Sequence, residues 1–523
     1  MVKFVADPAI ADKIQKMKQR VRWQEPLLQN QQIDQTRFVL ADGQNEDQAF
    51  SFLVIGDSGA GSHRGYHPQR KVAELLLANQ QDCRFILHTG DVIYLLGSSE
   101  YYGKNFIEPY REFLVGGEHP HRIAYDRMTF KLPIFPVLGN HDYYDLPFLS
   151  TIASVASRPF RLFLRSKLDF DVGWHGSRQG DAFARAFLDY LKPLTLPELM
   201  HHLQDHYTAK TDTGRCLTYK PGQFTRLPNR YYRFQYGGID FFALDSSTFN
   251  APQPLPHSAQ GDVLRESLEQ KREAIAQEKN LLFDQAALLD PNDPEEEELL
   301  DYYHTKLTQL DEVEVDIDKQ LTLEPGTVTD WEQLDWFKTQ LIASWQNPNI
   351  RGRIVFFHHP PYVTETSKWQ QAQTLAVRQR LQEALDAVAG EIGDLTQGRS
   401  LINLVFNGHA HCLEHLETLN TGHADSQIHW LICGGSGYSL RRQRAEGSTL
   451  IASELESNGG SAIAQSHLFI GRSGRGSHRR RPYSALRVEV QPGNPPQFKI
   501  YPLVAEWYQH EWRDYPTQPF EIH

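Results

Sequence analysis

The chain has 523 residues, of which 23% are charged and 40% hydrophobic, a composition that excludes disordered and collagen-like proteins. Its 53 Lys and Arg against 65 Asp and Glu give a net charge of −12, which disfavours a dedicated nucleic-acid-binding protein because phosphate backbones are also negative. The four cysteines, Cys83, Cys216, Cys412 and Cys433, lie far apart, which excludes a disulfide scaffold and a thiolate zinc site.

Residues 1–48 are predicted to be a polar lead-in with one amphipathic helix from about Pro8 to Arg22. Asp7 is a candidate N-cap, and Pro8 suits the first helical position, where no N–H is needed. The five Lys and Arg side chains from Lys13 to Arg22 are interpreted as a solvated helix face. The segment lacks the apolar core of a signal peptide, and no stretch approaches about 18 consecutive apolar residues. We therefore expect a cytoplasmic protein without a membrane span.

From residue 49 onward, short apolar runs alternate with helical segments such as residues 71–78 and 331–345, which predicts a layered α/β fold. Six runs break abruptly into polar clusters and are predicted to be buried strands: FSFLVIG, CRFILHTG, LPIFPVLG, IDFFALD, RIVFF and LINLVFNG. Residues 230–236 and 239–244 flank Gly237-Gly238 and predict an antiparallel hairpin, so the sheet is mixed at least in part. ALRVEV and QFKIYPLVAEWY are predicted to complete the sheet.

Three stretches are predicted to be insertions into one domain, residues 49–523. Residues 145–228 are irregular, and we expect a small lobe or a long cover. Residues 259–322 predict two antiparallel helices separated by DPNDPEEE, which pack on each other through two apolar stripes and form an accessory hairpin that could bind a protein partner. Residues 441–482 are rich in Gly, Ser and Arg, and we expect a mobile loop whose arginine clusters are solvated.

Each of the six apolar runs is followed by polar residues that could bind a metal or a substrate. In chain order these are Asp57, Asp91 with Tyr94, Asn140 with His141, Asp245, His358 with His359, and His409 with His411. Ligands of open α/β folds bind at the carboxyl ends of adjacent strands, so we expect the six clusters to converge on one crevice. Each cluster alone is weak evidence, since a Gly-Asp pair at a strand end is usually an ordinary turn. Together they predict a metal centre.

The type and number of the donor groups indicate which metals this centre would hold. Carboxylate, amide, phenol and imidazole donors suit borderline or hard cations such as Zn²⁺, Mn²⁺ and iron. Six or seven ligands exceed the needs of one tetrahedral site, which predicts a two-metal centre with a shared carboxylate. Asp245 is interpreted as a buried strand-end aspartate outside the metal set.

The order of these blocks resembles the calcineurin-like metallophosphoesterase superfamily, and in particular its purple acid phosphatase branch. The blocks of that branch read here Gly56-Asp57-Ser58-Gly59, Gly90-Asp91-Val92-Ile93-Tyr94, Gly139-Asn140-His141-Asp142, His358-His359-Pro360 and Gly408-His409-Ala410-His411. Other branches carry a histidine two residues after the first aspartate, where this chain has Gly59, and Tyr94 compensates for it. The resemblance covers about residues 50–145, 229–250, 328–365 and 400–440.

The resemblance implies a fold and a ligand set. The fold is a four-layer α/β/β/α sandwich of two mixed sheets, here with a helical-hairpin insertion. One metal would be bound by Asp57, Asp91, Tyr94 and His411, and the other by Asp91, Asn140, His358 and His409. The tyrosinate implies Fe³⁺ in the first site, with Zn²⁺, Fe²⁺ or Mn²⁺ in the second.

The resemblance also suggests how the leaving group is protonated. His141 would contact phosphate or donate a proton, and Asp142 would orient His141 or a ligand histidine. Relatives of the mammalian type have a further histidine where this chain has Ser367, so the proton could come from His141 alone or from His359.

The predicted activity is metal-dependent hydrolysis of phosphoesters, in particular phosphomonoesters, by a metal-bound hydroxide. The substrate would be a phosphorylated small molecule or protein. A phosphodiesterase or nucleotidase of the same fold is one alternative, and a partner-binding protein with an inactive core is another. The complete ligand set argues against the inactive core. A nuclease is disfavoured because the arginine clusters lack interleaved aromatic residues.

Overall fold

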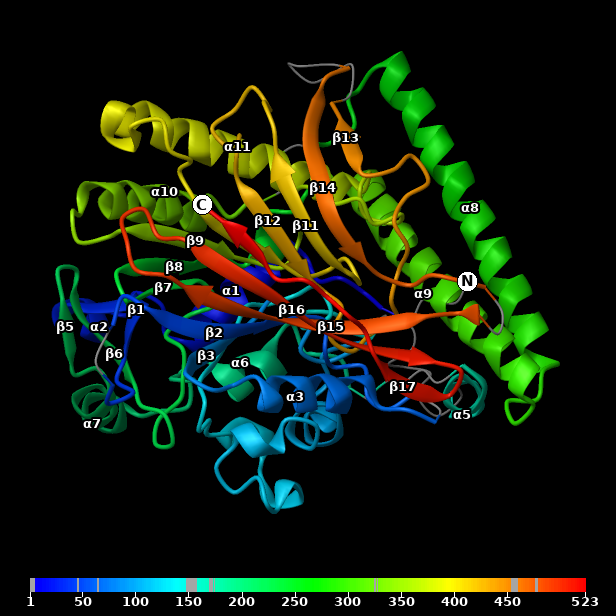
Figure 1. Cartoon of the computed structure of the whole chain (residues 1–523), viewed down its shortest axis with the longest axis horizontal. Coiled ribbons are helices and arrows are strands. Elements are labelled where there is room, and N and C mark those ends of the chain that lie inside the picture. Colours follow the sequence, from blue (N-terminus) through cyan, green and yellow to red (C-terminus); the bar gives the residue numbers. More distant parts are fainter. Residues whose placement is uncertain are drawn as a thin grey trace.

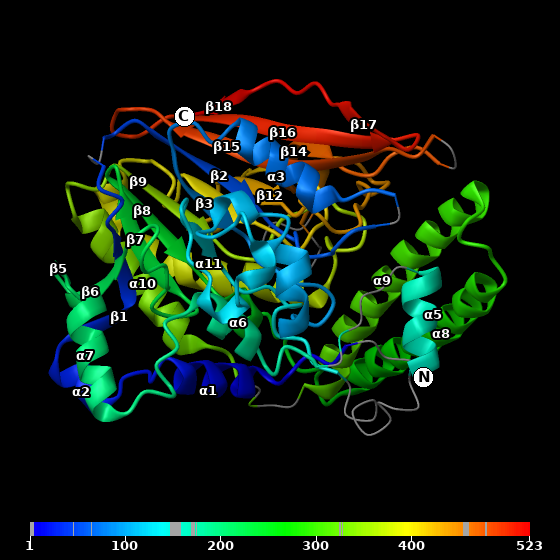
Figure 2. The same ribbon diagram turned by 90° about the horizontal axis from the view of Figure 1, so that it is seen from below.

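Two mixed β-sheets packed face to face form the centre of the molecule (Figures 1 and 2). The computed structural model describes residues 5–44, 47–63, 65–146, 158–168, 173, 175–323, 326, 328–452, 460–475 and 478–523. One sheet has seven strands, in the order β17-β16-β15-β2-β3-β4 with β18 paired to β16. Its strands are β2 (Phe50–Ile55), β3 (Cys83–His88), β4 (Ile134–Pro136), β15 (Arg481–Val490), β16 (Phe498–Tyr508), β17 (Glu511–Asp514) and β18 (Phe520–Ile522).

The second sheet has eleven strands, in the order β13-β14-β11-β12-β10-β9-β8-β7-β1-β6-β5. They are β1 (Ile33–Leu40), β5 (Ala209–Thr211), β6 (Gly214–Tyr219), β7 (Tyr232–Tyr236), β8 (Ile239–Ala243), β9 (Gly352–Phe356), β10 (Leu404–Asn407), β11 (Leu413–Thr418), β12 (His429–Cys433), β13 (Thr449–Ile451) and β14 (Ala462–Ile470). All six predicted strands are present. The predicted hairpin is also confirmed, with Gly237 and Gly238 at φ +56° and +75° in the turn between β7 and β8.

Aromatic side chains fill the space between the two sheets. Phe52 of β2 meets Phe241 of β8 edge-to-face at 5.7 Å between ring centroids, and meets Phe406 of β10 at 5.9 Å. All three side chains are fully buried. Strands buried on both faces read as continuous apolar runs, which is why these strands were evident in the sequence.

Helices cover the outer face of each sheet, so the four-layer α/β/β/α sandwich is confirmed. On the seven-stranded sheet, α3 (Pro68–Ala78) buries Val72 and Leu76. On the eleven-stranded sheet, α10 (Trp331–Gln346) and α11 (Ala372–Ile392) bury apolar faces in a second core cluster. The remaining helices are α1 (Ile10–Arg20), α2 (Pro26–Asn30), α5 (Arg158–Lys167), α6 (Asp181–Phe187), α7 (Leu196–His206), α8 (Ala259–Ala287) and α9 (Pro294–Thr322). No helix in the described ranges is both long and apolar enough to cross a membrane.

The lead-in is part of the same folded unit, so the boundary predicted at residue 48 is not a structural one. Strand β1 lies between β6 and β7 in the large sheet. Asp7 does not cap α1, whose N-cap is Ala9, but forms ion pairs with Lys13 at 2.6 Å and with Lys319 of α9 at 2.7 Å. Lys13 is fully buried and Arg20 is buried against α6, so the predicted solvated face is wrong at these two positions.

Two of the predicted insertions also contribute strands. Residues 145–228 supply β5 and β6, and residues 441–482 supply β13, β14 and the first two residues of β15. Polar and glycine-rich flanks obscured β5, β6, β13 and β14, which lie at the two ends of the large sheet. Arg441, Arg444 and Arg479 are buried, so the prediction of solvated arginine clusters is wrong for them. Within the predicted insertions, residues 147–157, 169–172, 174, 453–459 and 476–477 lie outside the described residues.

The third insertion forms two antiparallel helices, α8 and α9, as predicted, and both views place them together at one end of the molecule (Figures 1 and 2). Lys279 of α8 bonds Asp311 at 2.9 Å and Glu314 at 2.8 Å on α9. Two hydrogen bonds between Thr248 and Asp330, which we call the clamp, join the points where the chain leaves the core and where it returns after the insertion. There Asp330 N–H donates to Thr248 O at 3.1 Å, and the Thr248 hydroxyl donates to the Asp330 carboxylate at 2.8 Å.

Candidate metal centre

The polar clusters that follow β2, β3, β4, β9 and β10 meet at one edge of the sandwich. Asp57, Asp91 and Asn140 follow strands of the seven-stranded sheet, whereas His358, His409 and His411 follow or precede strands of the eleven-stranded sheet. The ten predicted ligand and catalytic residues are at most 3% exposed: Asp57, Asp91, Tyr94, Asn140, His141, Asp142, His358, His359, His409 and His411. Both sheets therefore build the site.

Strained turns direct these side chains into the site. Asp57, Asp91 and His409 all have left-handed backbone, with φ of 55°, 54° and 66°. Such φ values are uncommon outside glycine and are often found at functional sites. Gly90 lies at φ +98°, and a Cβ there would be 2.7 Å from His358 Nδ1, so only glycine fits before Asp91.

The residues of the first predicted site gather around one phenol oxygen. Tyr94 Oη lies 2.8 Å from Asp57 Oδ1, 2.9 Å from Asp91 Oδ2 and 3.2 Å from His411 Nε2. These four side chains come from three separate loops, yet their donor atoms are in mutual contact. The arrangement matches the ligand set expected for the first metal.

The residues of the second predicted site gather around His358. His358 Nε2 lies 2.9 Å from Asn140 Oδ1 and 3.2 Å from Asp91 Oδ2. The rings of His358 and His409 are 5.0 Å apart between centroids, and one donor atom each of Asp57, Asp91 and His358 lies within 4.8 Å of the others. Asp91 therefore touches members of both groups, as a shared carboxylate would.

The hydrogen-bond pattern shows that these residues fit metal ions. His358 Nδ1 donates to Thr89 O at 2.8 Å, and His411 Nδ1 donates to Ser439 O at 3.0 Å. Nε2 of His358 thereby faces Asn140 Oδ1 and Asp91 Oδ2, and Nε2 of His411 faces Tyr94 Oη. Acceptors that face one another across about 3 Å repel unless a cation lies between them. The site could therefore hold two ions, bound by the residues named above.

Burial and mutual charge set the protonation states. Burial raises the pKa of Asp57 well above its usual range, with the neighbouring Asp91 adding to this and His358 opposing it. Burial disfavours a charge on His358, but Asp91 outweighs it and raises the pKa of His358 to about 9. Burial holds the pKa values of His409 and His411 well below their usual range. Neutral imidazole is the form that binds metal.

Comparison with known proteins relates part of the chain to a family. Residues 50–281 match the family model described as calcineurin-like phosphoesterase. This match confirms the predicted resemblance over that part of the chain, which is less than half of its length. This family hydrolyses phosphoesters with metal ions, and the buried Asp and His clusters are the residues that could bind them. No curated protein sequence matches the chain.

Solved structures with a similar fold include a purple acid phosphatase from yellow lupin (Lupinus luteus) seeds, which is 11% identical with a TM-score of 0.40. The match covers 92% of this chain and 54% of the lupin chain, so this chain spans about half the length of that protein. A dimetal phosphatase from Danio rerio is 12% identical with a TM-score of 0.32, over 81% of this chain and 98% of that one. PhoD is 13% identical with a TM-score of 0.33, and the match covers 91% of this chain and 73% of PhoD.

His141 lies beside the candidate metal centre. Its Nδ1 donates to Leu95 O at 2.7 Å, and its peptide N–H donates to Asp91 Oδ1 at 2.8 Å. Nε2 lies 4.0 Å from Asp91 Oδ2, and the ring lines a small enclosed cavity. Because Nδ1 is committed to a carbonyl, Nε2 is the nitrogen left to exchange a proton or contact phosphate.

Asp142 and His359 have surroundings that differ from the predicted ones. The Asp142 carboxylate accepts the peptide N–H groups of Val92 at 3.0 Å and Gly139 at 3.0 Å, so it braces the loops around Asp91 and does not orient the His141 ring. The two ring nitrogens of His359 lie 2.8 Å from Ser246 Oγ and 3.3 Å from Asn250 Nδ2. This arrangement favours a supporting role for His359 beside His409 over proton donation.

Asp245 is not part of the centre, as the sequence predicted. Its carboxylate lies 3.1 Å from the buried Arg230 guanidinium and accepts the Tyr143 hydroxyl at 2.7 Å. These contacts support the interpretation of Asp245 as a buried strand-end aspartate outside the metal set.

The hairpin is not an accessory element, because α9 forms the roof of the candidate metal centre. Tyr438 stacks on Tyr94 with centroids 3.9 Å apart and planes within 6°, and its hydroxyl lies 3.3 Å from Thr308 of α9. Apolar residues of both hairpin helices join Tyr94, Leu95 and Tyr438 in a third core cluster. Asp311 and Glu312 of α9 line the same cavity as His141. The apolar stripes predicted a self-contained hairpin, yet they also cover the site.

Polar contacts that could not be predicted from the sequence continue from α9 to the centre. Lys368 Nζ donates to Glu312 at 2.8 Å, and Arg441 lies 3.7 Å from the same carboxylate. Burial opposes ionisation of Glu312, but these two cations lower its pKa to about 2. Gln373 Nε2 lies 3.3 Å from His409 Nε2. Of the residues missed, only Tyr438 had a signal, since it ends the LICGGSGY block after β12.

Proposed function

We propose that the chain is a phosphomonoesterase of the purple acid phosphatase type, with Fe³⁺ in the site of Tyr94 and Zn²⁺, Fe²⁺ or Mn²⁺ in the other. The contact of Tyr94 Oη with Asp57, Asp91 and His411 carries this proposal, because a phenol in that position replaces the histidine of other branches. Two bound cations would supply charge neutralisation for the phosphate and a water nucleophile activated near neutral pH.

The side chains of this chain supply the remaining chemistry. Asp91 holds the two ligand groups together, and its Oδ1 receives the peptide N–H of His141, which fixes the loop that carries Asn140. His141 Nε2 would donate a proton to the leaving oxygen, with Leu95 O holding the ring in place. The roof of α9 excludes bulk water, which strengthens electrostatic interactions in the site.

A substrate panel on the metal-loaded protein tests the proposal. We expect kcat/KM for 4-nitrophenyl phosphate to exceed that for bis(4-nitrophenyl) phosphate at least tenfold. The reverse preference would favour the phosphodiesterase alternative, and no turnover of either ester by metal-loaded protein would favour the partner-binding alternative. His467→Ala is a suitable control for His141→Ala, because His467 is 45% exposed and lies on β14 away from the cavity.

The physiological substrate is proposed to be a phosphorylated small molecule or protein that acts in the cytoplasm. The exposed apolar residues of α8, Val263, Leu264 and Leu281, support the proposal that the hairpin also contacts a protein partner.

A further inference from the structure

A second polar cavity of about 640 Å³ lies on another side of α9 from the metal centre. Its walls are α9, the segment after Tyr438 and the segment after β14. Six basic side chains line it: Lys306, Arg441, Arg442, Arg472, Arg475 and Arg479. No carboxylate is found among its described lining residues. We call this space the arginine cavity. Its volume falls in the range of small-ligand sites.

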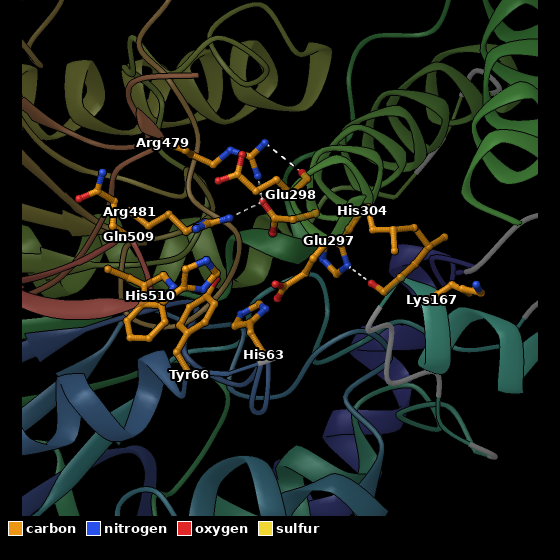
Figure 3. Close-up of a pocket in the computed structure, with 14 residues that line it drawn as sticks. His63, Tyr66, Lys167, Glu297, Glu298, His304, Arg479, Arg481, Gln509 and His510 are labelled. Atoms are coloured by element: carbon orange, nitrogen blue, oxygen red, sulfur yellow. Dashed lines mark hydrogen bonds and ion pairs between the residues drawn. The ribbon is translucent and has the colours of Figure 1, made fainter. Parts of the chain in front are cut away.

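The basic residues of the arginine cavity outnumber their acidic partners. Asp301 of α9 forms ion pairs with Arg472, Arg479 and Arg481, so one carboxylate serves three guanidinium groups. Figure 3 shows Arg479 and Arg481 on the wall of a smaller cavity, which shares Arg479 with the arginine cavity. Among the described residues, these two are the only arginines that line the smaller cavity. Within the part of the chain that the structure describes, Arg442 and Arg475 form no ion pair with a carboxylate.

Buried donors in the arginine cavity also lack acceptors. Arg441 is 1% exposed, yet among the described residues its Nε and Nη2 have no hydrogen-bond partner, and neither has Nε of Arg472. Burial lowers the pKa of Arg472 to about 10, with Arg479, Arg481 and Arg441 adding repulsion and Asp301 opposing it. Unpaired buried donors are unfavourable, and an anion close to these guanidinium groups would be stabilised by their charge.

We propose that the arginine cavity binds a small polyphosphate that carries at least two phosphate groups. Among the described residues, the six cations have three carboxylate partners: Glu278 for Lys306, Glu312 for Arg441, and Asp301 for Arg472 and Arg479. The remaining three positive charges exceed what one phosphate group neutralises, and each guanidinium group can bind two phosphate oxygens. The bounded volume and the net charge of −12 disfavour a long nucleic acid. Thr305 connects the two sites without merging them, since its hydroxyl lies 2.9 Å from Ser439 Oγ and 2.9 Å from Arg472 Nη1.

The test measures binding of methylenediphosphonate, whose P–C–P bridge resists hydrolysis, to the full chain by calorimetry. We expect Arg442→Gln/Arg475→Gln to weaken binding at least tenfold, which is about 1.4 kcal/mol. Both residues are exposed, so the variant should fold. Arg122→Gln/Arg127→Gln removes the same charge from exposed positions outside the cavity and should change the Kd less than twofold. Equal weakening of binding in the two double variants would mean that the diphosphonate is attracted by the charge of the whole protein, and this result would overturn the proposal.

The metal centre could also bind the diphosphonate, and Asp91→Asn separates the two sites. The arginine cavity lies outside that centre, so Asp91→Asn should keep a binding step that Arg442→Gln/Arg475→Gln removes. Loss of all binding in Asp91→Asn, with unchanged binding in the arginine variant, would show that the diphosphonate binds only the metal centre. Methylphosphonate, with one phosphate-like group, should bind the arginine cavity at least tenfold more weakly. Equal affinity would contradict the requirement for two groups.

Discussion

Tyr94 contacts two carboxylates and one histidine, and the proposed Fe³⁺ site depends on this contact. A phenolate bound to Fe³⁺ gives a visible charge-transfer band, so iron-loaded protein should be coloured. Tyr94→Phe should bleach the band without necessarily abolishing hydrolysis, because Asp57, Asp91 and His411 remain. Tyr438→Phe is the matched control: its ring stacks on Tyr94, but its hydroxyl contacts Thr308. Absorption spectra of both variants test whether Tyr94 binds Fe³⁺. A colourless, fully active protein that contains only zinc or manganese would contradict the assignment of Fe³⁺ but not the proposed hydrolysis.

Asp91 and His141 are in contact, but we expect their substitution to have different effects. Asp91 contacts both ligand groups, so Asp91→Asn should lose both metals and nearly all activity. His141→Ala should retain both metals and lose turnover by a factor of about 10²–10⁴, as expected for a general acid. Metal analysis of the purified variants, together with kcat, checks the prediction. Full metal loss in His141→Ala would place His141 among the ligands.

The residues of the centre could be predicted because each one follows an apolar strand within a short block. Asp57, Asn140 and His358 are examples, and the structure brings them together. The roles of Asp142 and His359 could not be predicted in this way, since they depend on which backbone amide or hydroxyl lies opposite each side chain. Glu312 had no signal, because a glutamate on an acidic helix is usually solvated.

At the scale of elements, the ion pair between Glu312 and Lys368 joins α9 to the loop that precedes α11. The pKa of Glu312 is lowered from 4.5 to about 2 in the folded protein. A lowered folded-state pKa stabilises the fold above the unfolded pKa, and this contribution is lost as the pH falls from about 4.5 toward 2. Glu312→Gln should therefore reduce the free energy of unfolding by a few kcal/mol at pH 7.

Denaturant unfolding at pH 7, 4.5 and 3 measures this contribution. The difference between the wild type and Glu312→Gln should shrink at each step toward acid. Glu295→Gln, at an exposed position in the first turn of α9, is the control and should change stability by less than about 0.5 kcal/mol at every pH. A difference that stays constant with pH would show that packing, and not charge, connects α9 to this loop.

Elements with strong periodicity could be predicted from sequence, and those formed by long-range pairing could not. The helices α8 and α9 show apolar stripes at helical spacing, and β2 or β9 show continuous apolar runs. Strands β1, β6 and β14 mix polar and apolar residues, since they lie toward the edges of the large sheet. The position of α9 over Tyr438 was not predictable, because an apolar stripe does not reveal which of its neighbours it covers.

At the scale of the whole molecule, the metal centre connects the two sheets. Asp57, Asp91 and Asn140 come from one sheet, and the three ligand histidines come from the other. Metal binding therefore favours the packed arrangement over unfolded chain, and chelation should lower Tm. Thermal unfolding with and without a chelator measures this, and added metal should restore Tm. Asp91→Asn should show no further decrease with chelator. An unchanged Tm after verified metal removal would mean that packing alone sets the stability.

The clamp between Thr248 and Asp330 has a consequence for how this protein can diverge. It closes the core at the base of the insertion, so whatever lies between these residues can be exchanged, lengthened or rebuilt without moving the strands that carry the ligands. The same insertion supplies the roof of the centre and one wall of the arginine cavity. Selection can therefore reshape the roof and the arginine cavity while the strands that carry the candidate metal ligands keep their positions.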